Sequence, residues 1–288
     1  MLRYYELVPG FAVSALIEIE PLTASLGAEV RGLDLRQVPG DPALGLQLRE
    51  LLHRHLVLGF RLQFLDDDEQ VALGATFGMP VVHVIEQALG RNRPWEEISD
   101  SPTKLPDRDG WHTDAPFLPQ PPSVAILRAL TVPAAGGDTL FANMHAAYDA
   151  LSVGMRRILE GLDVSYPPNQ GLAEYVQLHF GDDAARRVRE LSGDGAVHPL
   201  IREHPVTGRP LVYFADGFAD SIVGLHAAEG AVLRSFLVEL PKNPNIQCRW
   251  RWHEGDVVMW DEVATQHYGA ADHAGAERVM RRVLASSA

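Results

Sequence analysis

Residues 124–142 read VAILRALTVPAAGGDTLFA and contain two short strand-like runs on either side of a turn. The first run, Val124–Ala129, is apolar, and the second, Thr139–Ala142, directly follows the Gly-Gly-Asp of the turn. Short runs of this kind, bounded by Pro and Gly, are typical of the strands of β-sandwiches and barrels. The segment therefore predicts a core built mainly of short strands.

Similar runs recur along the rest of the chain. The other segments expected to form strands are Ile17–Glu20, Ala28–Arg31, Leu56–Phe60, Leu211–Phe214, Asn245–Trp252, Asp256–Trp260 and Arg278–Leu284. Helices are expected at Leu44–His55 and Asp66–Thr76 and, within a helical insertion at about 144–240, at Met144–Leu151, Val153–Leu162 and Ala227–Leu240. Leu89–Asp109 is polar and contains three prolines, so it is expected to be a long surface loop, a lid or a binding loop. Strands divided by a helical insertion favour a mainly β core with added helices.

The composition is that of a globular protein with an acidic surface. Hydrophobic residues make up 46% of the 288 residues, and Asp and Glu outnumber Lys and Arg by 38 to 25, a formal net charge of −13. A field of that sign repels a phosphate backbone and an anionic membrane surface, so neither nucleic acid nor membrane is expected as a partner. The single cysteine, Cys248, cannot form an internal disulfide, which favours a cytoplasmic location.

The chain is expected to fold as one domain preceded by a short arm. Residues 7–17 are fairly apolar, but Pro9 and Gly10 interrupt them, and no run approaches the roughly 18 apolar residues of a membrane-spanning helix. Residues 1–16 are therefore interpreted as an N-terminal arm rather than a signal peptide. No linker or repeat divides residues 17–288.

Trp111-His112-Thr113-Asp114 directly follows the polar loop and carries two residue types that bind metals. In an extended chain His112 and Asp114 lie on the same face, because they are two residues apart. A His-x-Asp sequence is often only a surface His beside an acid, so a third ligand has to come from another segment. The histidines that could supply it are His198, His204, His226, His253 and His267.

Two imidazoles and one carboxylate leave open positions on a metal ion, which suits Fe(II) in O2 chemistry. Zinc more often recruits three nitrogen or sulfur ligands, so a zinc hydrolase is the less favoured alternative. Thr139, after the Gly-Gly-Asp turn, and the arginines Arg278, Arg281 and Arg282 could bind a carboxylate or sulfonate. Each of these features alone is more often a hairpin turn or a solvated strand edge.

Taken in order, these motifs resemble the taurine/α-ketoglutarate-dependent dioxygenase (TauD/TfdA) family. The matching residues, between about Ile17 and Val283, are Trp111–Asp114, Pro121-Pro122, Gly136–Thr139, Trp250–Trp252, Trp260-Asp261, Thr265–Tyr268, Arg278 and Arg282. The resemblance implies a double-stranded β-helix, the jelly roll of cupin-like proteins, and an enzyme that uses Fe(II), α-ketoglutarate and O2. It also implies a homo-oligomer, either a dimer or a tetramer.

By the same resemblance, His112, Asp114 and His267 are the catalytic residues that bind the iron. Thr139 and Arg278 would bind the distal carboxylate of α-ketoglutarate. The implied reaction hydroxylates an unactivated carbon and yields succinate and CO2 as co-products.

Substrate contacts are implied at His83, Phe218 and Arg282, which match pocket residues of taurine-type members. An arginine and a histidine in these places favour a small anionic substrate. The classes considered are a sulfonate such as taurine, an alkyl sulfate, and a carboxylate or amino-acid-like metabolite.

Four positions depart from the taurine-type pattern. Glu86 replaces a Tyr, Arg108 an Asn and Leu172 a second pocket Phe, and Glu262 replaces the Asn that usually follows the Trp-Asp pair. Glu86 and Arg108 are expected to pair with each other or to contact the substrate. These departures lead to the hypothesis that the substrate is anionic but is not taurine itself. The alternatives are a biosynthetic tailoring oxygenase acting on a larger zwitterionic substrate and a non-catalytic cupin-like metal-binding module.

Overall fold

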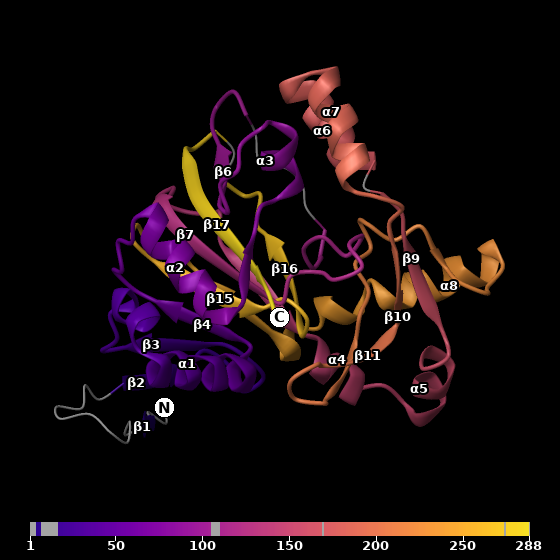
Figure 1. The fold of residues 1–288 in the computed structure, drawn as a ribbon. Coiled ribbons are helices and arrows are strands. Elements are labelled where there is room, and N and C mark those ends of the chain that lie inside the picture. Colours follow the sequence, from indigo (N-terminus) through magenta and orange to yellow (C-terminus); the bar gives the residue numbers. More distant parts are fainter. Residues whose placement is uncertain (1–3, 7–16, 105–109, 169, 274, 288) are drawn as a thin grey trace.

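The computed structural model describes residues 4–6, 17–104, 110–168, 170–273 and 275–287. Its largest sheet has nine strands, which come from both ends of the chain (Figure 1). In spatial order these are β1 (Tyr4–Glu6), β2 (Ile17–Pro21), β3 (Ala28–Arg31), β4 (Val57–Phe60), β15 (Val257–Asp261), β7 (Val124–Thr131), β17 (Arg278–Ser286) and β5 (Met79–Val81), with β6 (Glu96–Asp100) also paired to β17. All neighbours are antiparallel except β3 and β4.

A three-stranded sheet covers one face of the large sheet. It has the order β14 (Gln247–Trp250), β8 (Thr139–Asn143) and β16 (Thr265–Gly269). The two sheets meet through large side chains, since the rings of Phe141 on β8 and Trp260 on β15 are 5.2 Å apart. The core between these sheets therefore lies directly beside β16.

Helices cover the opposite face of the large sheet. Strand β15 shows this division, because Val258 and Trp260 belong to the core shared with the small sheet, whereas Val257 and Met259 pack with α1 (Pro42–His55) and α2 (Asp67–Phe77). Alternate residues of a strand point to opposite faces, so a sheet covered on both sides carries continuous apolar runs. Such runs give a clear sequence signal, and β4, β7 and β15 were predicted from them.

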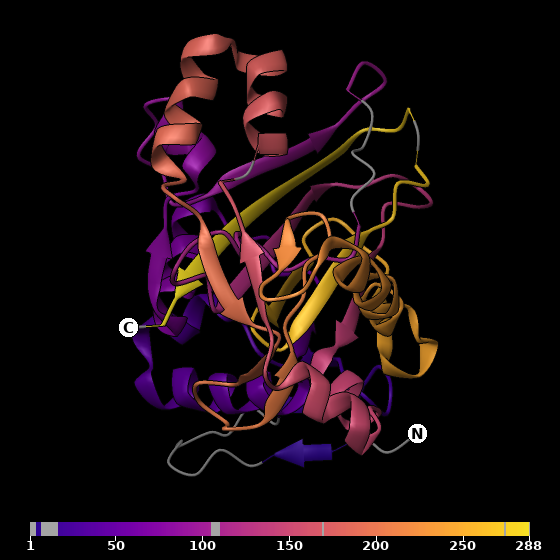
Figure 2. The ribbon, with the colours of Figure 1, turned by 90° about the vertical axis from the view of Figure 1, so that its right-hand side faces the viewer.

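The remaining elements surround these two sheets. The helices are η1 (Leu35–Gly40), α3 (Val84–Ala88), α4 (Met144–Asp149), α5 (Val153–Leu159), α6 (Gln170–Phe180), α7 (Asp182–Leu191), α8 (Ala227–Leu237), η2 (Leu240–Lys242) and η3 (Pro244–Ile246). The other strands are β9 (Asp163–Tyr166), β10 (Ala196–Pro199), β11 (Ile201–Glu203), β12 (Pro210–Val212) and β13 (Ser221–Ile222). Helices α6 and α7 form a hairpin that stands out from the rest of the molecule (Figures 1 and 2).

Most of the predicted elements are confirmed within a few residues, including the mainly β core with added helices. The expected loop at Leu89–Asp109 is wrong in part, because Glu96–Asp100 forms β6 against β17. Strand β16 and the α6–α7 hairpin were not predicted. Within the expected arm, Tyr4–Glu6 pairs with β2, and residues 1–3 and 7–16 lie outside the described residues. No helix in the described ranges is long and apolar enough to cross a membrane.

Candidate active site

Two segments far apart in the sequence hold the site together. The backbone N–H of His112 donates to the carbonyl of His267 at 3.1 Å, and the N–H of His267 donates back to the carbonyl of His112 at 2.8 Å. This isolated antiparallel bridge places the two imidazole rings 4.2 Å apart between their centroids. Strand β16 therefore supplies the third ligand candidate beside the His-x-Asp sequence.

The donor atoms of His112, Asp114 and His267 converge on one point. They lie within 4.8 Å of one another, with His112 Nε2 3.9 Å and His267 Nε2 4.0 Å from Asp114 Oδ1. His112 Nδ1 donates to the carbonyl of Gly110 at 2.8 Å, which leaves the lone pair of Nε2 for a metal. Two imidazoles and a carboxylate are the donor set that suits non-haem Fe(II), so the residues present fit that ion.

The charges around the cluster favour the forms that bind metals. Burial alone would raise the pKa of Asp114, but the Arg282 guanidinium and the two imidazoles hold it below its usual range. Burial and the neighbouring His112 lower the pKa of His267 well below its usual value. The carboxylate is therefore ionised and the imidazole neutral near pH 7, as metal ligation requires.

Glu262 lies directly beneath the ligands and connects them. One carboxyl oxygen accepts from Trp260 Nε1 at 2.7 Å, and the other contacts the Thr113 hydroxyl at 2.7 Å and accepts from the backbone N–H of Asp114 at 3.0 Å. His267 Nδ1 lies 3.8 Å from the same carboxyl group. Burial and the nearby Asp114 raise the pKa of Glu262 well above its usual value.

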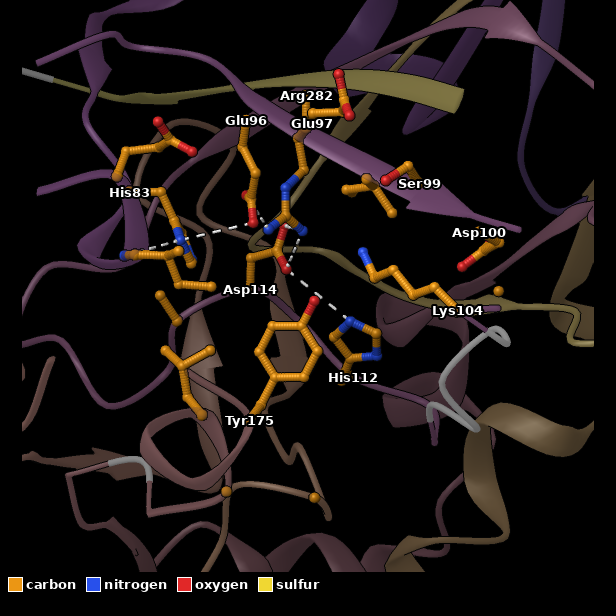
Figure 3. A pocket seen from close by; sticks show the side chains of 18 of the residues that line it. His83, Glu96, Glu97, Ser99, Asp100, Lys104, His112, Asp114, Tyr175 and Arg282 are labelled. Carbon is orange, nitrogen blue, oxygen red and sulfur yellow. Dashed lines mark hydrogen bonds and ion pairs between the residues drawn. The ribbon is translucent and has the colours of Figure 1, made fainter. Parts of the chain in front are cut away.

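A cavity of about 760 Å³ opens above these residues (Figure 3). The predicted site residues that line it are His83, Glu86, His112, Asp114, Phe218, Arg278 and Arg282. Arg108 lies outside the described residues. Leu172 also lines the cavity, from α6, so the unpredicted hairpin supplies part of its wall.

Of the two residues expected to bind α-ketoglutarate, Arg278 lines the cavity and Thr139 does not. Arg278 is buried and lines the cavity, and its Nε donates to the carbonyl of Gly137 at 3.1 Å. Thr139 lies on β8 outside that lining, and its hydroxyl oxygen accepts from Trp252 Nε1 at 3.0 Å. The close approach of the turn needs glycine, because a Cβ at Gly137, which has φ +69°, would lie 3.0 Å from Arg278 Cδ.

Glu86 pairs with arginines close to it in the sequence, and the expected pairing with Arg108 lies outside the described residues. Its side chain is buried and accepts a bidentate contact from Arg93, with Arg93 Nη2 3.0 Å from Oε1, and Arg91 Nη1 lies 3.7 Å away. The carboxylate is therefore neutralised by arginines of the segment just after α3. His83 caps α3 by accepting from the backbone N–H of Ile85 at 3.4 Å.

Glu96 is a site residue that the sequence reasoning missed. It lies on β6 directly opposite Arg282 on β17, and Arg282 Nη2 donates to it at 2.7 Å. The same register places Glu97 opposite Arg281 and Asp100 opposite Arg278. The signal was present as an acidic run that complements the arginines of the last strand, but the polar composition of residues 89–109 was interpreted as a loop.

A second group of two histidines and an aspartate does not fit a metal. His53 Nδ1 and His204 Nε2 lie 3.2 Å and 2.9 Å from Asp261 Oδ2. His204 Nδ1 accepts from the backbone N–H groups of Val206 and Thr207 at 3.2 Å and 3.1 Å, so its proton is on Nε2. Because Nε2 donates to Asp261, it has no lone pair for an ion, and the group is a hydrogen-bonded network.

One protein family matches nearly the whole chain. The family model "Taurine catabolism dioxygenase TauD, TfdA family" matches residues 18–284. The chain is 31% identical to an alkylsulfatase of Acinetobacter baylyi over 275 residues, which cover 93% of this chain and 84% of the relative. It is 32% identical to an alpha-ketoglutarate-dependent sulfate ester dioxygenase of Pseudomonas putida over 277 residues, covering 93% and 88% of the two chains.

Solved structures agree with this result. The crystal structure of a taurine dioxygenase from Burkholderia xenovorans has a TM-score of 0.78 at 32% identity, covering 94% of this chain and 91% of that one. A structure of AAD-2 in complex with Mn(II) and N-oxalylglycine has a TM-score of 0.77 at 26% identity, covering 94% and 98%. The chain therefore belongs to the TauD/TfdA family of non-haem iron dioxygenases, enzymes that depend on Fe(II), α-ketoglutarate and O2.

Proposed function

We propose that this enzyme hydroxylates a small organic anion at a site held by His112, Asp114 and His267. The observation that carries the proposal is the convergence of these three donors beside a cavity that His112, Asp114 and the buried Arg278 line. The names of relatives point to sulfate esters and aryloxy carboxylates as substrate classes, and the family name points to sulfonates. The two facing sheets support a double-stranded β-helix, the jelly roll of cupin-like proteins, as the core.

The chain's own residues bind and orient the reactants. When bound, Fe(II) with α-ketoglutarate and O2 supplies the oxidation, in which C–H becomes C–OH and α-ketoglutarate becomes succinate and CO2. His112, Asp114 and His267 would hold the metal, and Arg278 offers a guanidinium to the distal carboxylate of α-ketoglutarate. Burial lowers the pKa of Arg278, yet an arginine stays protonated near pH 7 and keeps its charge for that carboxylate.

Apolar side chains form the wall that receives the carbon chain of the substrate. The Phe218 ring is 6.1 Å from His112 and 6.2 Å from Phe117, between the ligands and the core. Leu172 and Tyr175 of α6 also line the cavity. These rings and aliphatic groups keep water from the reacting carbon and favour a substrate with an apolar part.

We also propose where the enzyme is located and how its chains assemble. Cys248 is buried and without a disulfide partner, which supports a reducing compartment such as the cytoplasm. The family resemblance supports a homo-oligomer, and the acidic net charge supports the absence of nucleic acid and anionic membrane as partners. One domain over residues 17–288, preceded by an arm, is the proposed organisation.

The proposal is tested by anaerobic titration of α-ketoglutarate into Fe(II)-loaded protein, watching for a visible metal-to-ligand charge-transfer band. The wild type is expected to give the band, His267→Ala to lose it, and Arg278→Ala to need at least about tenfold more α-ketoglutarate, since a charged contact is lost. Arg36→Ala, an exposed arginine paired with Asp34, is the matched control and should behave as the wild type.

Succinate release over a panel of sulfates, sulfonates and carboxylates then identifies the substrate class. Absence of the band in protein that has bound iron would overturn the dioxygenase proposal and favour a metal-binding module. Efficient turnover of taurine at low KM would contradict the narrower hypothesis that taurine is not the substrate.

A further inference from the structure

The guanidinium of Arg282, which was expected to bind the substrate anion, already forms ion pairs with two carboxylates of the chain. Its Nη1 donates to both carboxylate oxygens of Asp114 at 2.8 Å, and its Nη2 donates to Glu96 Oε2 at 2.7 Å. The remaining nitrogen, Nε, is buried and has no partner among the described residues. Two carboxylates therefore bracket this one cation.

The fold holds Glu96 in this position. Glu96 and Arg282 face each other in the antiparallel register of β6 and β17, and His83 Nδ1 lies 3.7 Å from the other oxygen of Glu96. Bound Fe(II) would offset the charge of Asp114, so Glu96 is the carboxylate that a substrate anion at the same guanidinium would meet. Two negative groups that contact the same buried guanidinium repel each other strongly, so the substrate anion needs another cationic partner.

Lys104 is the cation that offers such a contact. It follows β6 in a turn closed by its backbone N–H, which donates to the carbonyl of Ser101 at 3.1 Å, and it lines the cavity. Its side chain reaches into the cavity in Figure 3. Within the part of the chain that the structure describes, no carboxylate lies within 4.0 Å of its ammonium group.

Among the residues that the structure describes, the acid nearest to Lys104 in the sequence is Asp100, and it has other partners. Asp100 Oδ2 is 3.0 Å from His273 Nε2 and 4.0 Å from Arg278 Nη1. The other lysine of the sequence, Lys242, pairs with Glu239 at 2.6 Å. Since Asp100 is paired elsewhere, the ammonium group of Lys104 meets no partner acid among the described residues and offers its charge to an anionic ligand in the cavity.

We propose that Lys104, and not Arg282, binds the anionic head group of the primary substrate, while Glu96 holds Arg282 against Asp114. The head group is a sulfate ester, sulfonate or carboxylate, and the inference rests on the proposed function. Lys104 is thus a substrate-binding residue and Glu96 a specificity-determining residue. Glu96 makes the Arg282 side of the cavity electrically neutral, so that only the Lys104 side attracts an anion.

The first test uses the holoenzyme with hexyl sulfate, hexanesulfonate and hexanoate as probes and succinate release as the measure. Lys104→Met is expected to raise the KM for the preferred anion by about tenfold or more, because a charged hydrogen bond is lost. Lys104→Arg should restore most of the affinity. Lys242→Met is the matched control and should leave KM unchanged.

Glu96→Gln tests the second half of the proposal. Removing its charge frees part of the Arg282 guanidinium, so the KM for the same anion is expected to fall severalfold. A rise in KM in this variant would show that Glu96 itself contacts the substrate, which would overturn its assigned role.

Lysine acetylation gives a readout that needs no turnover, because the sequence has only two lysines. Each anion is added to the anaerobic Fe(II)–α-ketoglutarate protein, an amine-acetylating reagent follows, and mass spectrometry quantifies the two peptides. At least one anion should protect Lys104 severalfold and leave Lys242 fully reactive. Equal labelling of Lys104 with and without every anion would overturn the inference.

A third outcome separates the two possible sources of the anion. If Lys104→Met weakens α-ketoglutarate binding in the charge-transfer titration and leaves the KM of the anion unchanged, the lysine serves the co-substrate and the inference is wrong. Loss of the charge-transfer band in the wild type would instead refute the proposed function, so the two failures are distinct.

Discussion

Among single side chains, Glu262 contacts two of the metal-ligand residues, Asp114 and His267, without being a ligand itself. It accepts from Trp260 and Asp114, contacts Thr113 and faces His267 Nδ1. Groups that support metal ligands in this way typically change metal affinity by about 10- to 100-fold when removed. We expect Glu262→Ala to weaken Fe(II) binding by that factor, measured by anaerobic titration of the metal-free protein.

The same substitution is also expected to lower the free energy of unfolding. Each buried donor left without an acceptor costs about 1 to 3 kcal/mol, which urea unfolding of the metal-free protein would detect. Glu254→Ala, in an exposed turn, is the control and should change neither quantity. Wild-type Fe(II) affinity in Glu262→Ala would show that the carboxyl group does not support the ligands.

The sequence predicted individual site residues well where their spacing is local. His112 and Asp114 share a face because they are two residues apart in an extended segment, and the structure brings their side chains together. The ion pair between Arg282 and Glu96 could not be predicted from the sequence, because the two residues lie on different strands. A pairing between distant segments depends on strand register, which no local pattern specifies.

Two of the strands that were not predicted, β6 and β16, carry side chains that face charged partners or the site. Strand β6 reads as polar, yet Glu96, Glu97 and Asp100 each face an arginine of β17. Cross-strand pairs of opposite charge stabilise a sheet without any apolar alternation. Strand β16 likewise carries the polar sequence Thr265-Gln266-His267, because it serves the site, and so it lacked the apolar run that marked β15.

Strand β4 depends on a glycine for its contact with the small sheet. A Cβ at Gly59 would lie 2.2 Å from the Trp250 ring, which is buried and has the Arg61 guanidinium 3.8 Å from its centroid. Overpacking of this kind costs about 1 to 3 kcal/mol or more. We expect Gly59→Ala to lower the midpoint of urea unfolding, while Gly161→Ala, where a Cβ meets nothing within 4 Å, serves as control. An unchanged midpoint in Gly59→Ala would show that Trp250 can move at no cost.

The α6–α7 hairpin is attached to α3 through a small apolar cluster. Ala88, Ala173, Ala185 and Val188 are all buried there, and Arg187 Nη1 donates to the carbonyl of Ala88 at 3.1 Å. Because these residues are small, a larger side chain would push the hairpin away from the cavity. Ala185→Leu is therefore expected to raise substrate KM severalfold and to speed proteolysis of the hairpin.

The charge-transfer titration with α-ketoglutarate should stay unchanged in Ala185→Leu, because His267 and Arg278 belong to the sheets and His112 is bridged to His267. The exposed Leu191, at the end of α7, provides the control substitution Leu191→Ala. If Ala185→Leu altered the band and left KM unchanged, the hairpin would not form a wall of the substrate site.

Over the whole molecule, the fold class followed from the sequence because both faces of the large sheet are covered. That burial produced the apolar runs of β4, β7 and β15, which come from the start, middle and end of the chain. The order of these strands in the sheet could not be predicted, since it depends on pairings between segments remote in sequence. The site also depends on such pairings, because Arg278 on β17 and His267 on β16 come from two different sheets.

The stability of the whole chain is expected to fall in mild acid because it buries histidines as neutral groups. His145 Nδ1 donates to the carbonyl of Pro210 at 2.7 Å, and His198 Nε2 contacts the carbonyls of Pro116 and Leu118 at 2.9 Å and 3.1 Å. Burial lowers the pKa of both imidazoles. As the pH falls through about 6.5, these histidines take up protons in the unfolded chain but stay neutral in the folded chain. Their contribution to the free energy of unfolding is therefore fully present above that pH and is lost as the pH falls below it.

Comparing two chains isolates this effect from the other titrating groups. The Tm of metal-free wild type is expected to fall from pH 7.5 to pH 5.5 by more than the Tm of His198→Gln. Glutamine can still donate to the carbonyls of Pro116 and Leu118 but does not titrate. The raised pKa of Glu262 acts in the opposite direction, because the folded chain gains a proton there as the pH falls, and it is common to both chains. Equal slopes of Tm against pH would therefore mean that His198 takes up its proton without unfolding, and that the segment following Asp114 tolerates a charged imidazole.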